Sequence, residues 1–313
     1  MTSAVELETV PCDLCGSCDH ALLFVGADYR FGRKDQYAVV QCNSCGLIFL
    51  NPRPTPRALV RLYEEDYPFE AGAPPEGWRS WKMLRTFWHY LSGDSGDRLI
   101  ARLKGRVLDI GCGYGKLMLP LKDRGCDVYG TEVNPNCVEF CRAAGLNVFA
   151  GTLEDARLPS GFADCVIMSQ VLEHVPSPKR TLQEIHRILR PKGTAYVFCP
   201  NGDGYLRDVF GRFWHGWHIP FHLYVFTAET ITTLADEVDF RVASVHTVTP
   251  ADFLTTSLKS RVYGERDGMR PFERGKFFDS LVFRAIASAP LRLLDLLFKR
   301  KGDCLEVELI KSV

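Results

Sequence analysis

The sequence predicts an α/β protein in which helices cover both faces of a doubly wound, mainly parallel sheet. Between Arg106 and Cys199, short apolar segments alternate regularly with helix-like segments, as expected for a parallel sheet. The first apolar segment runs into a glycine-rich turn at residues 111–115. Two cysteine pairs precede this region and predict a separate small module held by a metal ion.

Composition limits the class of protein. The 313 residues carry a formal net charge of zero, which argues against wholesale binding to nucleic acid or to an anionic membrane. We see no basic start followed by an apolar run and no apolar stretch of about 18 residues, so we expect neither a signal peptide nor a transmembrane helix. Twelve cysteines then favour a reducing, cytoplasmic compartment and metal binding rather than disulfides.

Residues 1–50 contain two C-x-x-C pairs, and a glycine follows each pair. Four thiolates in tetrahedral array suit zinc, and so short a segment needs such a staple. A redox-active C-x-x-C would need no second pair. Cys18 and His20 are rival ligands beside the first pair. We therefore predict a zinc ribbon with structural Zn²⁺ on four ligands, Cys12, Cys15, Cys42 and Cys45.

The N-terminal part is acidic. Residues 1–70 carry six basic and ten acidic side chains, a net charge of −4. Such a module is a poor phosphate binder, so we expect no nucleic-acid partner and favour a structural or substrate-covering role.

Residues 51–104 are predicted to join this module to the main domain. Three prolines make residues 51–56 a stiff, extended linker. A short helix is expected at 57–63, a Pro/Gly loop at 71–77, an aromatic-rich helix at 78–91 and a further helix at 97–103.

The glycine-rich turn is the predicted cofactor site. It has the form G-x-G-x-G, with Gly111, Gly113 and Gly115, and Asp109 precedes it in the strand. Glycines in such a turn let a ligand approach the backbone closely, because there is no Cβ. A dinucleotide fingerprint would require a third glycine where Lys116 stands.

Residues 109–115 resemble the first motif of the class I S-adenosylmethionine (SAM) methyltransferases. The resemblance implies a Rossmann-like seven-stranded sheet that binds SAM through Asp109 and the three glycines. It assigns the ribose hydroxyls to Glu132, at the end of the second strand, where a carboxylate can accept both. It also implies that an acid after the third strand, either Glu154 or Asp155, meets the adenine amino group.

The other elements follow the same order. Asn134 as N-cap and Pro135 as first residue predict a helix that ends at Gly145. We predict the first helix at 114–124 and an amphipathic helix at 179–190. The strands after the first are expected at residues 127–131, 146–150, 162–168, 194–199, 241–248 and 305–311, the last two as an antiparallel pair.

Two loops carry the candidate catalytic residues. Residues 169–175 resemble a stretch that closes over the sulfonium in small-molecule and quinone methyltransferases. The resemblance implies that Gln170 belongs to the cofactor-binding residues and makes His174 a candidate base. Alternatively, the glutamate and the histidine of this stretch serve only to orient the loop. Three of the eight histidines lie within residues 215–222. The His-Leu-Tyr that begins at His222 resembles a subgroup with N-terminal zinc ribbons, found among sugar and secondary-metabolite methyltransferases.

A neutral histidine is the natural base for a hydroxyl, so we rank His222 first, His218 second and His174 third. The alternatives are a helix-capping His222 and a packed aromatic cluster. We expect no metal on the three histidines of 215–222, because no carboxylate or thiolate joins them in sequence. The tetrapeptide at 199–202 is not the one used on nucleobase amino groups.

About 55 residues separate the last two strands, and we expect residues 251–303 to form a helical lid over the substrate. Within them, residues 277–300 are strongly apolar and are predicted to be broken by Pro290. We interpret this segment as a lid or homodimer helix. The alternative is an interfacial helix with weak contact to a membrane or a lipid-linked substrate.

The sequence thus predicts a zinc ribbon (1–50), a linker with helices (51–104) and a SAM-dependent methyltransferase domain (105–313). The expected reaction is methyl transfer to a hydroxyl of a small polar acceptor, such as a sugar or secondary metabolite. Related sugar C-methyltransferases continue into a further C-terminal domain, which favours O-methylation here. The alternatives are a C- or N-methyltransferase on a nucleotide-sugar or metabolite, a zinc-ribbon RNA methyltransferase, and a non-enzymatic partner protein.

Overall fold

The computed structural model describes residues 5–66, 96–265 and 274–312. The loop predicted at 71–77 and the aromatic-rich helix predicted at 78–91 lie outside these residues.

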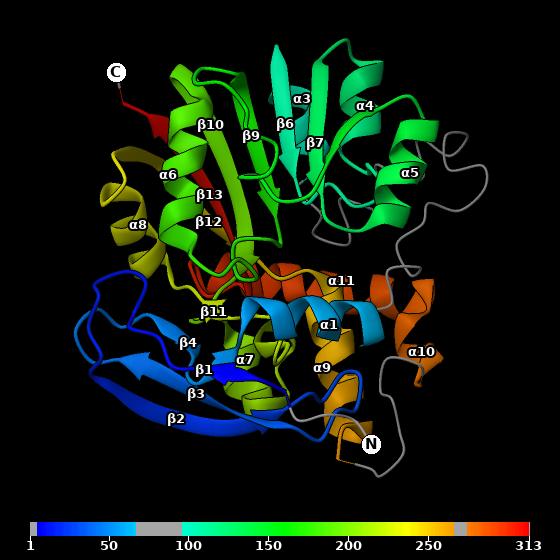
Figure 1. Ribbon diagram of the computed structural model, residues 1–313. Coiled ribbons are helices and arrows are strands. Elements are labelled where there is room, and N and C mark those ends of the chain that lie inside the picture. The colour runs from blue at the N-terminus through cyan, green and yellow to red at the C-terminus, as the bar shows by residue number, and fades with distance from the viewer. Residues whose placement is uncertain (1–4, 67–95, 266–273, 313) are drawn as a thin grey trace.

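A seven-stranded sheet forms the main body (Figure 1). Its order is β12-β13-β10-β9-β6-β7-β8, and the five strands from β10 to β8 are parallel, while β13 runs antiparallel to both neighbours. The predicted doubly wound α/β fold and its antiparallel last pair are confirmed. The strands are β6 (Arg106–Ile110), β7 (Asp127–Glu132), β8 (Asn147–Ala150), β9 (Ala163–Ser169), β10 (Leu189–Pro200), β12 (Phe240–Val248) and β13 (Cys304–Lys311).

The strand order reverses at β6, which lies between β7 and β9. Open α/β sheets bind ligands at such a switch point, beyond the carboxyl ends of the strands. The central strands read as apolar runs because both faces are covered, and Leu108, Val166 and Val197 are completely buried.

Helices connect these strands where the sequence signals them. Asn134 Oδ1 accepts hydrogen bonds from the backbone N–H groups of Asn136 and Cys137, as expected of an N-cap. The first helix begins at Met118 rather than at residue 114, because Gly115 has a left-handed φ of 73° that an α-helix cannot contain. The helices are α3 (Gly96–Arg102), α4 (Met118–Asp123), α5 (Pro135–Ala143), α6 (Pro178–Ile188) and α8 (Ala228–Asp236).

A second, four-stranded sheet holds the N-terminal module, and its order is β11-β4-β3-β2. Its edge strand β11 (Tyr224–Val225) comes from the main domain and pairs with β4, so a segment of the main domain completes the N-terminal sheet (Figure 1). The predicted linker is extended, but β5 within it pairs with β1. The elements are β1 (Leu7–Glu8), β2 (His20–Ala27), β3 (Gln36–Cys42), β4 (Ile48–Leu50), β5 (Arg53–Pro54) and α1 (Pro56–Asp66).

The long connection between β12 and β13 is helical. Its helices are α9 (Ala251–Tyr263), α10 (Lys276–Asp279) and α11 (Leu281–Leu297). The expectation that Pro290 breaks the segment is wrong, because α11 continues through it. A proline removes one backbone hydrogen bond, and a helix anchored by the buried Ala287 and Leu291 tolerates that loss.

Between β10 and β11 lie α7 (Tyr205–Phe210) and two short 3-10 helices, η3 (Gly211–Phe213) and η4 (His215–Trp217), against which α9 packs. Across the described residues, none of the helices combines the length and apolar character needed to span a membrane.

Candidate active site

The three glycines of the turn after β6 have different structural roles. All have left-handed φ angles, which glycine adopts without strain. A Cβ on Gly111 would lie 2.6 Å from Val171 Cγ2, and one on Gly115 would lie 2.6 Å from Leu146 Cδ1. A Cβ on Gly113 would meet no atom within 4 Å. Gly111 and Gly115 therefore allow close packing, whereas Gly113 leaves the backbone open to a ligand.

Two acids flank this turn at the carboxyl ends of β6 and β7. Glu132 Oε2 accepts the N–H of Gly113 at 2.8 Å, and Oε1 accepts the N–H of Asn134 at 2.8 Å. Each oxygen keeps a lone pair for a ligand hydroxyl. Asp109 is buried, and desolvation, with the nearby Glu132 charge, raises its pKa to about 7. A cationic ligand would restore its ionised form.

The two acidic side chains after β8 differ in their hydrogen bonding. Asp155 Oδ2 accepts the backbone N–H of Thr152 at 2.9 Å and its hydroxyl at 2.8 Å, which closes the turn that starts at Gly151. These bonds lower the pKa of Asp155. Glu154 is exposed on the same turn. Only Oδ2 of Asp155 takes part in this turn, and both acids are exposed, so either Glu154 or Asp155 can still meet a ligand.

The loop after β9 lies against the glycine turn. Gln170 has a left-handed φ of 56°, and its N–H donates to the carbonyl of Phe198 at 2.8 Å. This bend sends Val171 onto Gly111. The loop then carries Glu173 and His174, so the chain after β9 connects the predicted cofactor turn to the histidines.

The three predicted base candidates lie together, although they come from two loops. The ring centroids of His174 and His222 are 4.5 Å apart, and those of His218 and His222 are 4.9 Å apart. The carbonyl of Glu173 accepts the backbone N–H groups of Leu223 at 2.8 Å and Tyr224 at 3.2 Å, which ties the two loops to each other.

Hydrogen bonds orient the imidazoles. His222 Nδ1 lies 2.8 Å from the carbonyl of Gly216, so it carries the proton, and Nε2 faces Glu173 Oε1 at 4.0 Å. His174 Nδ1 lies 3.0 Å from the Phe221 carbonyl and 2.7 Å from the Tyr63 hydroxyl. Burial lowers the pKa of His174 to about 4 and that of His222 well below its ordinary value, so both rings are neutral at pH 7.

Glu173 is the member of this cluster that sequence reasoning undervalued. Its side chain is fully buried, and neither carboxylate oxygen has a hydrogen-bond partner within the described residues. Burial raises its pKa to about 8. Donor atoms of Glu173, His174 and His222 lie within 4.8 Å of one another, close enough to hold a metal ion. A carboxylate that is distant in sequence thus lies beside His222, although the group includes only one of the three histidines of 215–222, and the adjacency of Glu173 and His174 was the available signal.

The four predicted cysteine ligands also meet. Their sulfur atoms lie within 4.8 Å of one another, with Cys12 Sγ 3.5 Å from Cys45 Sγ and Cys15 Sγ 3.5 Å from Cys42 Sγ. Tetrahedral zinc with bonds of about 2.3 Å places sulfurs roughly 3.8 Å apart, so the set fits such an ion. The rival ligands Cys18 and His20 are not in this group.

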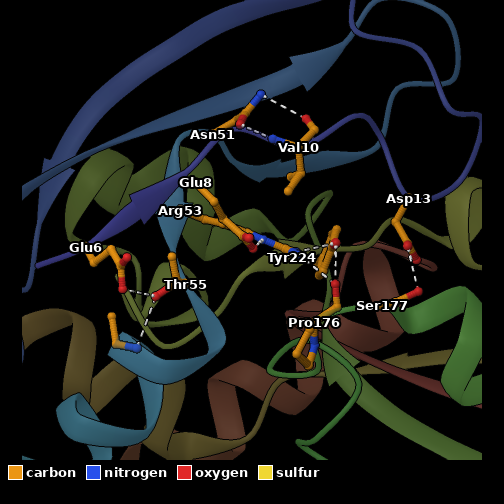
Figure 2. A network of polar contacts seen from close by, with 11 residues as sticks. Glu6, Glu8, Val10, Asp13, Asn51, Arg53, Thr55, Pro176, Ser177 and Tyr224 are labelled. Carbon is orange, nitrogen blue, oxygen red and sulfur yellow. Dashed lines mark hydrogen bonds and ion pairs between the residues drawn. The ribbon is translucent and has the colours of Figure 1, made fainter.

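Arg53 links the N-terminal module to the active-site loops (Figure 2). Its Nε donates to Glu8 Oε1 at 2.9 Å, and its Nη1 donates to the Pro176 carbonyl at 2.8 Å and the Tyr224 hydroxyl at 2.7 Å. The Tyr224 hydroxyl also donates to the Pro176 carbonyl at 3.0 Å. Pro176 follows the Glu173–His174 loop and Tyr224 follows His222, so one buried guanidinium holds both loops.

Asp13 makes a parallel link from the cysteine turn (Figure 2). It lies between Cys12 and Cys15 and accepts the Ser177 hydroxyl at 2.7 Å and the Lys179 N–H at 2.8 Å. Ser177 is the N-cap of α6 and Lys179 lies in its first turn, and this helix follows the Glu173–His174 loop. Asp13 therefore ties the cysteine turn to the start of α6, directly after the Glu173–His174 loop.

The sheet order, the glycine turn after β6 and the acid that ends β7 define the Rossmann-like fold of class I methyltransferases. The chain belongs to the family described as "Methyltransferase domain", whose profile matches residues 84–245, about half of the chain.

Curated relatives cover the same region. An uncharacterized methyltransferase of Mycobacterium tuberculosis is 37% identical over 118 residues, which are 36% of this chain and 48% of that protein. A ubiquinone biosynthesis O-methyltransferase of Xanthomonas oryzae pv. oryzae is 32% identical over 115 residues, 34% of this chain and 48% of that protein. The chain spans about half the length of these relatives. A SAM-dependent methyltransferase structure from Archaeoglobus fulgidus has a TM-score of 0.47 and 20% identity, over 72% of this chain and 99% of that chain.

Proposed function

We propose that this protein is a SAM-dependent methyltransferase that acts on a hydroxyl group of a small molecule. The observation that carries the proposal is the pair of hydrogen bonds that Glu132 accepts from the N–H groups of Gly113 and Asn134, beside a glycine that is open to a ligand. A carboxylate fixed in this way holds a ribose by its two hydroxyls.

The surrounding residues suit the same cofactor. The buried Asp109 favours a ligand with positive charge, and Glu154 faces solvent where the adenine amino group is expected. Bound SAM supplies a methyl group already activated on a sulfonium. The protein then has to align the acceptor, exclude water and remove one proton.

The histidine cluster is the proposed site of proton removal. A neutral imidazole accepts the acceptor's proton, and His222 remains our first candidate, followed by His218 and His174. Glu173 Oε1 lies 4.0 Å from His222 Nε2, so an imidazolium at His222 would favour the ionised form of Glu173 and be stabilised by it in turn. The same cluster could instead bind a metal ion that holds the acceptor, an arrangement favoured by the unpartnered carboxylate of Glu173.

The acceptor class is inferred from the names of relatives and from the N-terminal module. Relatives from Xanthomonas oryzae pv. oryzae and Psychrobacter cryohalolentis are named O-methyltransferases, and the N-terminal module with the His-Leu-Tyr sequence suits sugar or secondary-metabolite hydroxyls. Transfer to carbon or nitrogen is the runner-up. RNA is disfavoured by the net charge of −4 over residues 1–70. We also propose structural zinc on the four cysteines and, given these thiols, a reducing cytoplasmic setting.

Two measurements test the proposal in order. Calorimetry with SAM should detect binding, and its absence would favour a non-enzymatic protein. Incubation with methyl-labelled SAM and a panel of hydroxylated sugars and phenols should then place the label on oxygen. Label on carbon or nitrogen would correct the acceptor atom. Loss of activity on treatment with a chelator, reversed by a cation other than zinc while the cysteine-bound zinc stays in place, would favour the metal reading of the histidine cluster.

A further inference from the structure

Helix α11 carries a stripe of exposed apolar side chains. Along one face, spaced by three or four residues, lie Val282, Ile286, Ala289, Leu293 and Leu297. The four larger ones are between 57% and 69% exposed. Leu296 at 73% and Phe298 at 53% extend the stripe at its C-terminal end. An apolar surface of this extent is rare without a partner.

The opposite face of α11 packs against the rest of the protein. Ala287, Ser288 and Leu291 are buried. Asp295 accepts the hydroxyl of Thr249 at 2.8 Å and that of Tyr205 at 3.2 Å. The helix is therefore docked through one side, and the apolar stripe is not an uncovered part of the core.

Basic residues surround the stripe at both ends. Residues 274–301 contain seven basic and two acidic side chains, a net charge of +5 in a chain whose total is zero. Of the two acids, Asp295 faces the protein, and Asp279 pairs with Lys259 at 2.7 Å. Lys299, Arg300 and Lys301 directly follow the stripe and are exposed.

This charge pattern decides between the possible occupants. In an antiparallel pair of α11 helices, residues 299–301 of one copy would approach Arg274, Lys276 and Arg284 of the other. In a parallel pair they would approach one another. Both arrangements set like charges together, which disfavours a second copy of this chain. An anionic bilayer surface complements both the apolar stripe and its basic flanks.

We propose that the exposed face of α11 docks the protein onto an anionic lipid bilayer. The helix lies in the plane of the interface, with its apolar stripe among the acyl chains and its basic ends at the headgroups. Because α11 packs on α9, and α9 packs on η4 beside the histidine cluster, this contact brings the candidate active site to the membrane surface. The proposal does not depend on the methyltransferase activity.

Vesicle sedimentation with the full chain tests the proposal. The wild type should bind vesicles of phosphatidylcholine with phosphatidylglycerol and should bind vesicles of phosphatidylcholine alone at least tenfold more weakly. Replacing three stripe residues by glutamine should reduce binding at least tenfold; the changes are Ile286→Gln, Leu293→Gln and Leu297→Gln. Absence of wild-type binding, or equal binding by the variant, would overturn the proposal.

A matched control removes three apolar side chains of similar exposure elsewhere on the surface, namely Leu22→Gln, Val60→Gln and Val209→Gln. Its binding should equal that of the wild type. A second variant, Lys299→Gln with Lys301→Gln, leaves the stripe intact and should bind more weakly at low salt, which tests the surface independently if the stripe variant does not fold. A dimer in solution that the stripe variant separates, without vesicle binding by the wild type, would assign the surface to a second copy and refute the membrane proposal.

Discussion

Replacing Arg53 by methionine should destabilise the protein and slow its reaction while leaving SAM affinity nearly unchanged. The guanidinium makes three hydrogen bonds and is 9% exposed, whereas its ion-pair partner Glu8 is 32% exposed and can turn to water. The Pro176 carbonyl would keep its bond from Tyr224. Hydrogen bonds of charged groups contribute about 1.5–3 kcal/mol each, so with this compensation we expect a loss of about 2–4 kcal/mol in the free energy of unfolding.

Urea unfolding measures the stability change, and labelled methyl transfer measures the turnover. Turnover should fall because Pro176 and Tyr224 adjoin the loops of His174 and His222, whereas the three hydrogen bonds of Arg53 described above do not involve the glycine turn. Arg53→Lys should recover part of both losses, because a lysine can satisfy one of the three acceptors. Arg57→Met is the control on an exposed arginine of α1. A stability loss below about 0.5 kcal/mol with unchanged turnover would refute the conclusion that Arg53 holds the two loops together.

Four further predictions test the site. Glu132→Ala should weaken SAM binding about 10- to 150-fold in calorimetry, since bonds to a charged group are worth about 1.5–3 kcal/mol; wild-type affinity would remove the ribose assignment. Cys42→Ser should lose zinc in metal analysis, whereas Cys18→Ser should keep about one zinc per chain; equal loss in both would make Cys18 a ligand. His222→Ala should lower turnover about 10²- to 10⁴-fold with SAM affinity retained, and near-normal turnover would move the base to another histidine. Burial raises the pKa of Glu173 from 4.5 to about 8, so the folded state holds this proton more tightly than the unfolded chain. Its stabilising contribution is complete below the unfolded pKa and is lost as the pH rises toward 8, so the wild type should lose stability relative to Glu173→Gln between about pH 5 and pH 8 in urea unfolding; a constant difference would contradict the burial.

The sequence by itself determined the elements whose signals are local. Alternating apolar segments placed the strands, Asn134 and Pro135 placed the start of α5, and the spacing of the cysteine pairs indicated one cluster. Such signals depend on residues a few positions apart, because caps, turns and helix faces are formed within one or two turns of the chain. The start of α4 was predicted wrongly, because the local composition also suits a helix and does not reveal that Gly115 has a left-handed φ.

Tertiary structure alone decided which distant groups share one environment. Arg53, read from sequence as part of a linker, bonds residues 123 and 171 positions away, and no local pattern encodes that pairing. Glu173 became a buried partner of His222 because the loops after β9 and β10 end at the same sheet edge. The exposure of α11 was likewise fixed by which of its faces packs on α9. An apolar side chain favours burial, but only the assembled fold determines whether neighbouring residues bury it.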